Sequence, residues 1–209
     1  MSLTSELAQA LAEDAEALAA LHDRELTTET IAVLREVGFP ANLGLLPAGE
    51  LSLEAWCLMA AALQETDAAQ RDLLAVDYAA IYLTGAYGAS PCESVWTDDD
   101  HLVCQEAMFA LREIYAAAGL AAEDWRRRPD DHLVLQLLFI AHALRCSGGP
   151  DELRRLAAML DEHLLRCIGV LAEIERGSNE EFTLANDLMR KILPEHRKLH
   201  YVALFLHDI

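Results

Sequence analysis

Apolar residues recur at helical spacing along most of this chain, and that spacing constrains the fold more than any other feature. Leu7, Leu11, Leu18 and Leu21 show it near the N-terminus, where they share one helix face. No stretch alternates at period two for more than a few residues, so no sheet is predicted. Hydrophobic residues make up 53% of the chain and aromatics only 6%. Because Ala and Leu dominate the hydrophobic residues, we predict an all-α fold.

Capping residues and helix breakers predict the helix limits in the first half. A helix carrying the N-terminal leucines is followed by one that begins at Thr27 or Thr28 and stops at Gly38. Ser52 is expected to cap a third helix, after a loop. The fourth is expected from near Asp67 to Leu83.

The second half begins with an expected loop over residues 84–97, which Gly, Ser and Pro punctuate. Four further helices are expected: from near Asp98 to before Gly119, from Pro129 to about Arg145, from the 147–150 stop to about Glu175, and from Ser178 onward with a break at Pro194. We therefore predict one domain over residues 1–209, a bundle of about eight to ten helices. Residues 147–150 are a possible seam and hinge, so the chain is expected to be a monomer or a helix-exchanged dimer.

Charge and apolar run length restrict the partners and the location. The chain has 35 acidic residues against 16 Lys and Arg, a net charge of −19. Such acidity argues against nucleic-acid binding and favours basic partners. No apolar run is long enough to span a bilayer, and the N-terminus shows no export signal, so a cytoplasmic protein is expected. Five widely spaced cysteines without a C-x-x-C motif indicate reduced thiols.

Two segments in the middle of the chain carry candidate binding residues. Tyr78, Ile81 and Tyr82 share one helix face, which serves either as a core stripe or as part of a groove for an apolar peptide. In the loop Ser90–Asp98, Trp96 either packs the loop against the core or contacts a partner as an anchor residue. Ser94 lacks the flanking glycines of a nucleophile elbow.

A third segment, Pro129–His132, reads as a helix start. Proline suits the first helical position, and Asp130 and Asp131 complement the positive end of the helix. Asp131 either acts only in this capping role, or orients His132, or receives an arginine of a partner through a bidentate bond.

Together the three segments resemble the TorD/DmsD family of cytoplasmic chaperones for molybdenum-cofactor redox enzymes. The resemblance covers residues 77–145, with a weak echo at Asp161–Leu164. It implies that Asp131 and His132 match the family's Asp-His pair near the signal-peptide site. Three positions depart from the family pattern: Arg128 precedes the proline in place of glutamate, Gln136 follows the histidine in place of glutamate, and Gln105 replaces a glycine. These departures suggest a divergent member with its own client.

The resemblance implies a chaperone, not an enzyme, that binds the twin-arginine signal peptide and the apo form of a molybdoenzyme catalytic subunit before export. Seven residues are expected to bind the peptide: Tyr78, Ile81, Tyr82, Trp96, Asp130, Asp131 and His132. No catalytic residue, cofactor or metal site is expected, since His196 and His200 lack further ligands.

Three alternatives remain at the level of sequence. The first is a NarJ-type assembly chaperone for a nitrate reductase that faces the cytoplasm. The second is a hydrolase that uses His132 with Asp131 as its orienting group. The third is a helical scaffold without a ligand.

Overall fold

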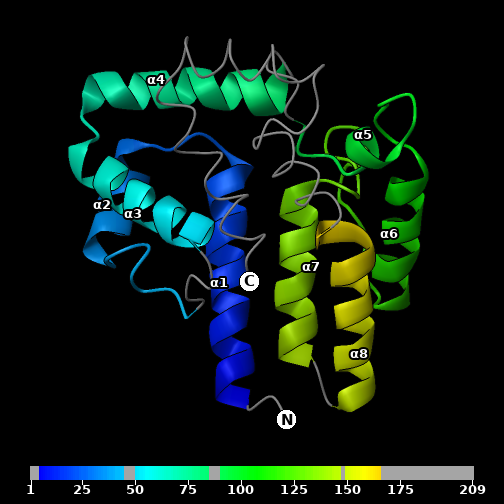
Figure 1. Ribbon diagram of the computed structural model, residues 1–209. Helices are drawn as coiled ribbons and strands as arrows, with labels where there is room; N and C mark the ends of the chain where they lie inside the picture. Colours follow the sequence, from blue (N-terminus) through cyan, green and yellow to red (C-terminus); the bar gives the residue numbers. More distant parts are fainter. Residues whose placement is uncertain (1–4, 45–49, 85–89, 147–148, 166–209) are drawn as a thin grey trace. The chain divides into compact units, whose positions relative to one another are not determined.

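The computed structural model describes residues 5–44, 50–84, 90–146 and 149–165 (Figure 1). In these residues the secondary structure consists of eight α-helices and two π-helical turns, with no strand. The all-α prediction is therefore confirmed. The elements are α1 Ser5–Asp23, α2 Thr28–Glu36, α3 Glu50–Glu65, α4 Ala68–Tyr78, η1 Ala79–Leu83, α5 Ser94–Thr97, α6 Glu106–Ala117, α7 Leu133–Cys146, α8 Pro150–Met159 and η2 Leu160–Leu164.

The chain divides into two compact units. The first unit combines Met1–Asp23 with Ser90–Cys167, and the second combines Arg24–Ala89 with Ile168–Ile209. The prediction of a single domain with a seam at residues 147–150 stays a prediction. None of the helices in the described part of the chain has both the length and the apolarity that a bilayer crossing requires.

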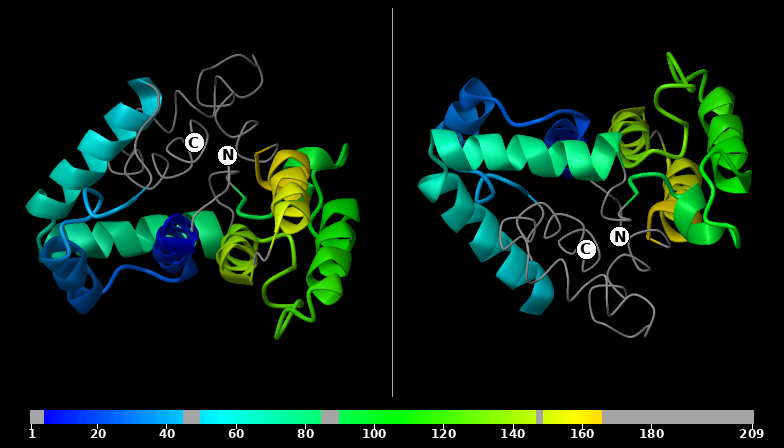
Figure 2. Two further views of the ribbon diagram at one scale, coloured as in Figure 1. Left: turned by 90° about the horizontal axis from the view of Figure 1, so that it is seen from below. Right: turned by 90° about the horizontal axis from the view of Figure 1, so that it is seen from above.

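The core of the first unit is formed by α1 and α7, which lie side by side in the views of Figures 1 and 2. Small side chains such as Ala12 and Ala15 are buried on α1, and Val134 and Leu137 are buried on α7, so both helices contribute to a closely packed core. Full burial of a leucine such as Leu18 contributes roughly 1.5–3 kcal/mol. The helix pair is therefore the scaffold from which the loops of this unit extend.

Two arginines connect α1 with α7 and with the residues just before α7. Arg128, just before α7, donates from Nη1 to Asp23 Oδ1 at 2.5 Å and from Nη2 to the Asp23 carbonyl at 3.2 Å. Arg145, in the last turn of α7, holds the carboxylate of Glu16 with both terminal nitrogens. Arg128, which stands where the family pattern has glutamate, thus anchors the chain before α7 to the end of α1.

The second unit shows several expected helix limits. Thr27 caps α2, and Gly38 follows that helix with a φ of +74°. Asp67 and Gln70 form a reciprocal capping box at the start of α4, as expected from the Asp67 position. Arg35 donates to the carbonyls of Leu63 and Thr66, both at 2.7 Å, so it satisfies groups that the end of α3 leaves open.

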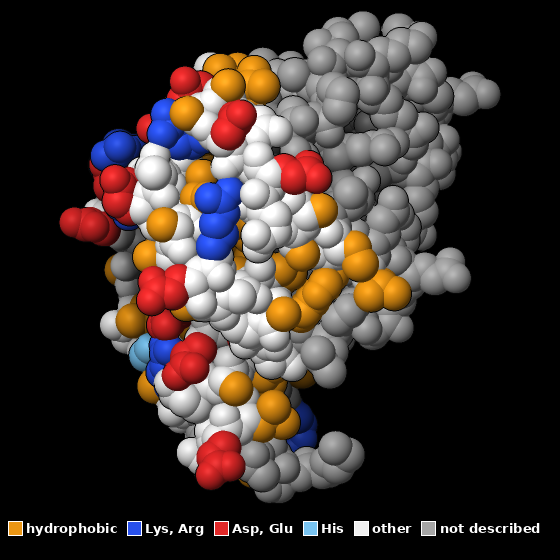
Figure 3. All heavy atoms as spheres, turned by 90° about the vertical axis from the view of Figure 1, so that its left-hand side faces the viewer, with side chains coloured by type: hydrophobic (Ala, Val, Ile, Leu, Met, Phe, Trp, Pro, Cys, Tyr) orange, Lys and Arg blue, Asp and Glu red, His pale blue; other side chains and the backbone are white. Residues whose placement is uncertain are grey.

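This unit also exposes hydrophobic side chains on α2, α3, α4 and η1, and at Val37 just after α2. Figure 3 shows hydrophobic side chains interspersed with charged ones at the surface. The exposed members in this unit are Val33, Val37, Leu53, Leu73, Val76 and Leu83.

Three helix starts differ from the sequence prediction. α3 begins at Glu50, so Ser52 lies inside the helix and is not its cap. The expected loop 84–97 ends in the short helix α5. The helix expected from Asp98 begins only at Glu106, because Asp98 Oδ2 accepts the backbone N–H groups of residues 100 and 102, and two nearby residues adopt a positive φ.

The helix expected from Pro129 was also placed wrongly, since α7 begins at Leu133. Residues 129–132 form a turn closed by a bond from His132 N to the Pro129 carbonyl. Pro150, in contrast, does stand in the first turn of its helix, α8. The expected features at Glu175, Ser178, Pro194, His196 and His200 lie outside the described residues.

Candidate peptide-binding site

Main-chain bonds join the loop after Ser90 to the turn before α7. Glu93 N donates to the Asp131 carbonyl at 3.1 Å, and Leu133 N donates to the Pro91 carbonyl at 2.8 Å. These two bonds make an isolated antiparallel bridge between Cys92 and His132. Two of the three segments singled out in the sequence are therefore in contact within the first unit.

Asp131 is fully buried, with 0% of its surface exposed. Its Oδ2 accepts the backbone N–H of Ser94 at 2.8 Å, at the start of α5. Its Oδ1 has no hydrogen-bond partner in the described part of the chain. The hydroxyl of Ser94 in turn accepts the N–H of Gln105 at 3.1 Å. Asp131 thus caps α5, the helix of the opposite loop, and not α7.

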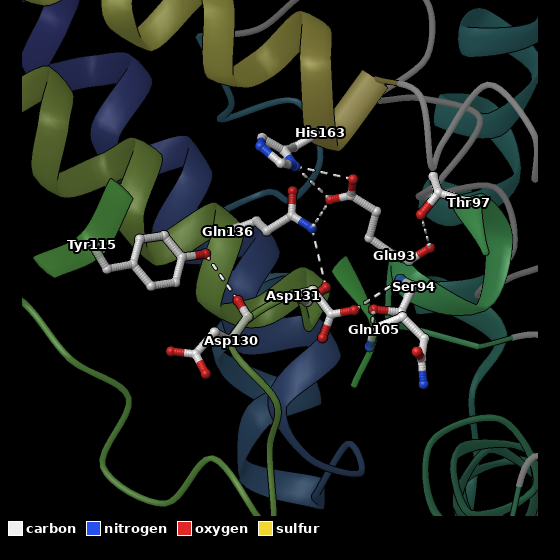
Figure 4. A network of polar contacts seen from close by, with 9 residues as sticks. All are labelled: Glu93, Ser94, Thr97, Gln105, Tyr115, Asp130, Asp131, Gln136 and His163. Atoms are coloured by element: carbon white, nitrogen blue, oxygen red, sulfur yellow. Dashed lines mark hydrogen bonds and ion pairs between the residues drawn. The ribbon is translucent and has the colours of Figure 1, made fainter. Parts of the chain in front are cut away.

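A buried polar network extends this contact (Figure 4). Gln136 Nε2 donates to Glu93 Oε2 at 3.2 Å and to the Asp131 carbonyl at 3.1 Å. His163 Nδ1 lies 3.0 Å from Glu93 Oε1. Both bonds fix the carboxylate of Glu93, which is only 1% exposed. Gln136, where the family pattern has glutamate, supplies the N–H donor that a carboxylate would lack.

Asp130 has a separate set of partners. Arg112, on α6, donates from Nε at 3.1 Å and from Nη2 at 2.7 Å to Asp130 Oδ2. The hydroxyl of Tyr115 donates to the Asp130 carbonyl at 3.0 Å. Burial, together with the negative charge of Asp130, raises the pKa of Tyr115. Asp130 therefore binds an arginine of this chain.

His132 caps α7 with its side chain. Its Nδ1 accepts the backbone N–H of Val134 at 3.1 Å, so this nitrogen carries no proton. Burial, together with the positive charge of Arg128, lowers the pKa of His132 to about 3. The imidazole is therefore neutral at physiological pH.

The aromatic candidates are more accessible. Trp96, on α5, is partly exposed, and its Nε1 donates to the Ser90 carbonyl at 2.8 Å. Tyr78 and Tyr82 lie in the second unit and stack at a centroid distance of 4.7 Å; both are partly exposed. Ile81 lies in the π turn η1, and its side chain lies outside the described part of the structure.

Four residues of the network were missed in the sequence: Glu93, Arg112, Tyr115 and His163. Glu93 stands inside the Ser90–Asp98 motif, and His163 stands inside the weak echo at Asp161–Leu164, so both were within recognised segments. Nothing in the sequence pattern connects Arg112 or Tyr115 to Asp130.

The arrangement offers no reactive group. Burial raises the pKa of Cys92 to about 12 and also raises that of Cys104, which keeps both thiols protonated. Ser94 is buried, and its hydroxyl accepts a main-chain N–H. Among the described residues no three or more His, Cys, Asp or Glu side chains are grouped to hold a metal ion.

A family model described as nitrate reductase delta subunit matches residues 49–173. This range includes α3 to η2, and with them the loop, the turn and the polar network.

Curated relatives share shorter stretches. The bifunctional uridylyltransferase/uridylyl-removing enzyme of Bradyrhizobium sp. (strain ORS 278) is 64% identical over 50 residues, 24% of this chain and 5% of that enzyme. The enzyme of the same name in Bradyrhizobium diazoefficiens is 62% identical over 121 residues, 48% of this chain and 13% of that enzyme. The chain thus spans only a small part of the relatives it matches.

Proposed function

The chain belongs to the nitrate reductase delta subunit family, and we propose that it binds an apolar segment of the apo catalytic subunit of a nitrate reductase and holds that subunit until its molybdenum cofactor is inserted. At the coarser level the protein is a NarJ-family molybdoenzyme assembly chaperone, and it is not an enzyme. The hydrolase interpretation of Asp131 and His132 is therefore wrong, and the two residues have structural hydrogen-bond partners instead.

The family match over residues 49–173 is the observation that carries this proposal. The NarJ family binds a nitrate reductase catalytic subunit. The match favours the NarJ-type alternative over the twin-arginine interpretation that the resemblance first suggested. We further propose that the chaperone acts in the cytoplasm, where an apo subunit is available before its cofactor arrives.

The proposed peptide-binding residues remain the seven identified in the sequence, but with two different roles. We assign contact with the client to the partly exposed Trp96, Tyr78 and Tyr82, and to Ile81 between the tyrosines. Aromatic side chains of this kind supply most of the energy in helix-in-groove recognition.

The remaining three residues are proposed to position the loop that carries Trp96. Asp130, Asp131 and His132 are buried and have partners within the chain. Because Asp130 is 1% exposed and Asp131 is 0% exposed, a client arginine does not reach either carboxylate in this conformation. The proposed role of Asp131 is therefore to hold α5, and through it Trp96, in place.

A twin-arginine leader is the second proposed ligand. The net charge of −19 favours a basic peptide and speeds its encounter with the chain. Its arginines would meet exposed carboxylates of the surface, where single ion pairs contribute little. The apolar part of the leader would then supply most of the affinity.

Calorimetry on the full chain tests both ligands. The first peptide comes from the start of the nitrate reductase catalytic subunit in the same genome, and the second is a twin-arginine leader with a Lys-Lys counterpart. We expect a micromolar or tighter Kd for the first peptide, which corresponds to about 8 kcal/mol. If the reductase peptide does not bind while the twin-arginine leader binds tightly, the first proposed ligand is wrong and the leader takes its place.

The site assignment needs matched variants. Trp96→Ala should weaken binding about tenfold or more, as expected of an aromatic anchor. Leu138→Ala, which truncates an exposed apolar residue of the same unit, should leave the affinity unchanged. Equal affinities for all three proteins would exclude Trp96 from the contact.

The curated relatives add no activity to this proposal. The shared stretches are 5% and 13% of those enzymes. A segment of that size does not bring their uridylyl-transferring or uridylyl-removing activity to this chain.

A further inference from the structure

An exposed aromatic and arginine cluster lies in the first unit, next to Asp130, whose carboxylate accepts hydrogen bonds from the one cluster member that also belongs to the polar network, Arg112. We call it the Trp125 cluster; it consists of Phe109, Arg112, Trp125 and Arg126. The guanidinium carbon of Arg112 lies 5.0 Å from the ring centroid of Trp125 and 5.6 Å from that of Phe109. The guanidinium carbon of Arg126 lies 4.7 Å from the Trp125 centroid. Trp125 is 37% exposed and Phe109 is 54% exposed.

The turn that carries Trp125 is held by its own backbone. Asp124 Oδ1 accepts the N–H of Arg126 at 3.2 Å, and the Asp124 carbonyl accepts the N–H groups of Arg127 and Arg128 at 3.1 and 2.9 Å. The carboxylate of Asp124 is therefore engaged with the main chain. The guanidinium groups project from an ordered turn, which lowers the entropy lost when a ligand binds.

Arg126 and Arg127 stand out because their guanidinium groups form no ion pair with the described residues, although Glu123 and Asp124 stand nearby in the chain. Neither guanidinium lies within 4.0 Å of a carboxylate of the described residues. In contrast, six other arginines in the described part of the chain form an ion pair with a carboxylate: Arg71, Arg112, Arg128, Arg145, Arg154 and Arg155. In a chain with 35 acidic residues, an arginine pair without such ion pairs beside an exposed indole is unusual.

We propose that the Trp125 cluster and Arg127 form a docking surface for an acidic peptide segment of a partner protein, in which carboxylate side chains lie beside apolar ones. Guanidinium groups bind carboxylates through paired hydrogen bonds, and the neighbouring Trp125 and Phe109 supply apolar contact. Trp and Arg are also the residue types that dominate interface energetics.

Charge complementarity favours a peptide over a polyanion. The net charge of −19 repels nucleic acids and anionic membranes, which approach with many charges at once. A short peptide senses mainly the local field, because charges farther than about 8 Å are screened at physiological ionic strength. Arg112 links this surface to Asp130, one of the proposed positioning residues, but Phe109, Trp125, Arg126 and Arg127 are not among the residues proposed to contact the reductase.

The test uses the full chain and a labelled peptide of sequence Glu-Glu-Leu-Phe-Glu-Glu-Leu, with a second peptide that has Gln in place of every Glu. Fluorescence anisotropy should show saturable binding of the acidic peptide and at least about tenfold weaker binding of the Gln peptide. Arg126→Glu with Arg127→Glu should weaken binding about tenfold or more. Arg154→Glu with Arg155→Glu, the matched pair on α8, changes the net charge equally and should change the affinity less than twofold.

Phe109→Ser tests the apolar half of the surface and should weaken binding about fivefold, while Leu138→Ser should not. Circular dichroism melting confirms that each variant is folded. The proposal is overturned by an absence of binding, by equal affinity for the Gln peptide, or by equal effects of the two arginine pairs. It is also overturned if the Arg126 and Arg127 variants lose binding to phosphatidylglycerol vesicles, or lose self-association in light scattering, while peptide binding is unchanged.

Discussion

His163 Nδ1 lies 3.0 Å from Glu93 Oε1, although 70 positions separate the two residues in the chain. His163 stands in the π turn η2 that follows α8, and Glu93 stands immediately before α5. An ionised carboxylate only accepts hydrogen bonds, so the Nδ1–H of His163 donates. This single contact ties the end of α8 to the loop that carries Trp96.

Breaking this pair should destabilise the first unit. Because both side chains are buried, His163→Ala leaves the carboxylate of Glu93 without its nearest hydrogen-bond donor, and we expect a loss of about 2 kcal/mol. His163→Gln retains an N–H donor and should lose less. Urea denaturation of the full chain at pH 7.5 measures the difference. Arg155→Ala, which removes an exposed ion pair with Glu152, should cost under about 0.5 kcal/mol; a loss for His163→Ala no larger than this would contradict the prediction.

Arg112 should stabilise the fold chiefly because it compensates the charge of Asp130. Arg112→Leu leaves that carboxylate buried and unpaired, and a loss of about 2 kcal/mol is expected, since Arg112 itself is partly exposed. Asp130→Asn in the same background should recover part of the loss. A double-mutant cycle by chemical denaturation gives the coupling free energy, and additive losses would show that the two side chains act independently.

Acid should destabilise the fold through two buried histidines. Burial lowers the pKa of His22 to about 4 and that of His132 to about 3, from 6.5. Below pH 6.5 the unfolded chain binds protons at these sites and the folded chain does not, so stability falls as pH falls. Each histidine contributes up to about 1.4 kcal/mol per pH unit once the unfolded chain is protonated, which gives roughly 3 kcal/mol for both between pH 6.5 and 5.

The variant His132→Asn isolates one of these two contributions. Asparagine supplies an oxygen that caps helices well and does not titrate, so it can replace Nδ1 as the acceptor for the Val134 N–H. Urea denaturation at pH 7.5 and pH 5 should show a smaller acid-induced loss for the variant, by about 2 kcal/mol. The same loss in both proteins would mean that His132 is protonated in the folded state.

The capping box of α4 should stabilise the second unit locally. Asp67 Oδ1 accepts the N–H of Gln70 at 2.9 Å, and Gln70 Oε1 accepts the N–H of Asp67 at 2.8 Å. Asp67→Ala removes one of these bonds and should cost about 1 kcal/mol. Hydrogen exchange should become faster in the first turn of α4 while α7 keeps its protection. Unchanged exchange in α4 would show that the box contributes nothing in solution.

Helix class and several helix limits could be predicted from the sequence because local signals determine them. Thr27, Gly38 and Asp67 act on backbone groups a few residues away, so the sequence around each of them contains both partners of the interaction. The buried apolar faces of α1 and α7 likewise follow from helical spacing.

The start of α7 could not be predicted because a long-range contact determines it. Pro129 is suited to a first helical turn, but the backbone of Asp131 and Leu133 pairs with Pro91 and Glu93 instead. Two non-glycine residues with positive φ, His101 and Cys104, delay α6 in a way that no local pattern indicates. The candidate site shows the same limit, since Asp131 was recognised but the residue whose N–H its carboxylate accepts, Ser94, lies 37 positions away.

The bridge between Cys92 and His132 holds the backbone of the loop through main-chain hydrogen bonds. Only main-chain atoms of Pro91, Glu93, Asp131 and Leu133 form it, and the side chains that support it, those of Glu93 and Asp131, are buried, so the partly exposed side chains of the loop take no part in the bridge. Substitutions along the outer side of the loop can therefore alter what a client meets without rerouting the backbone. A chaperone built in this way can acquire a new specificity one residue at a time while its support stays the same.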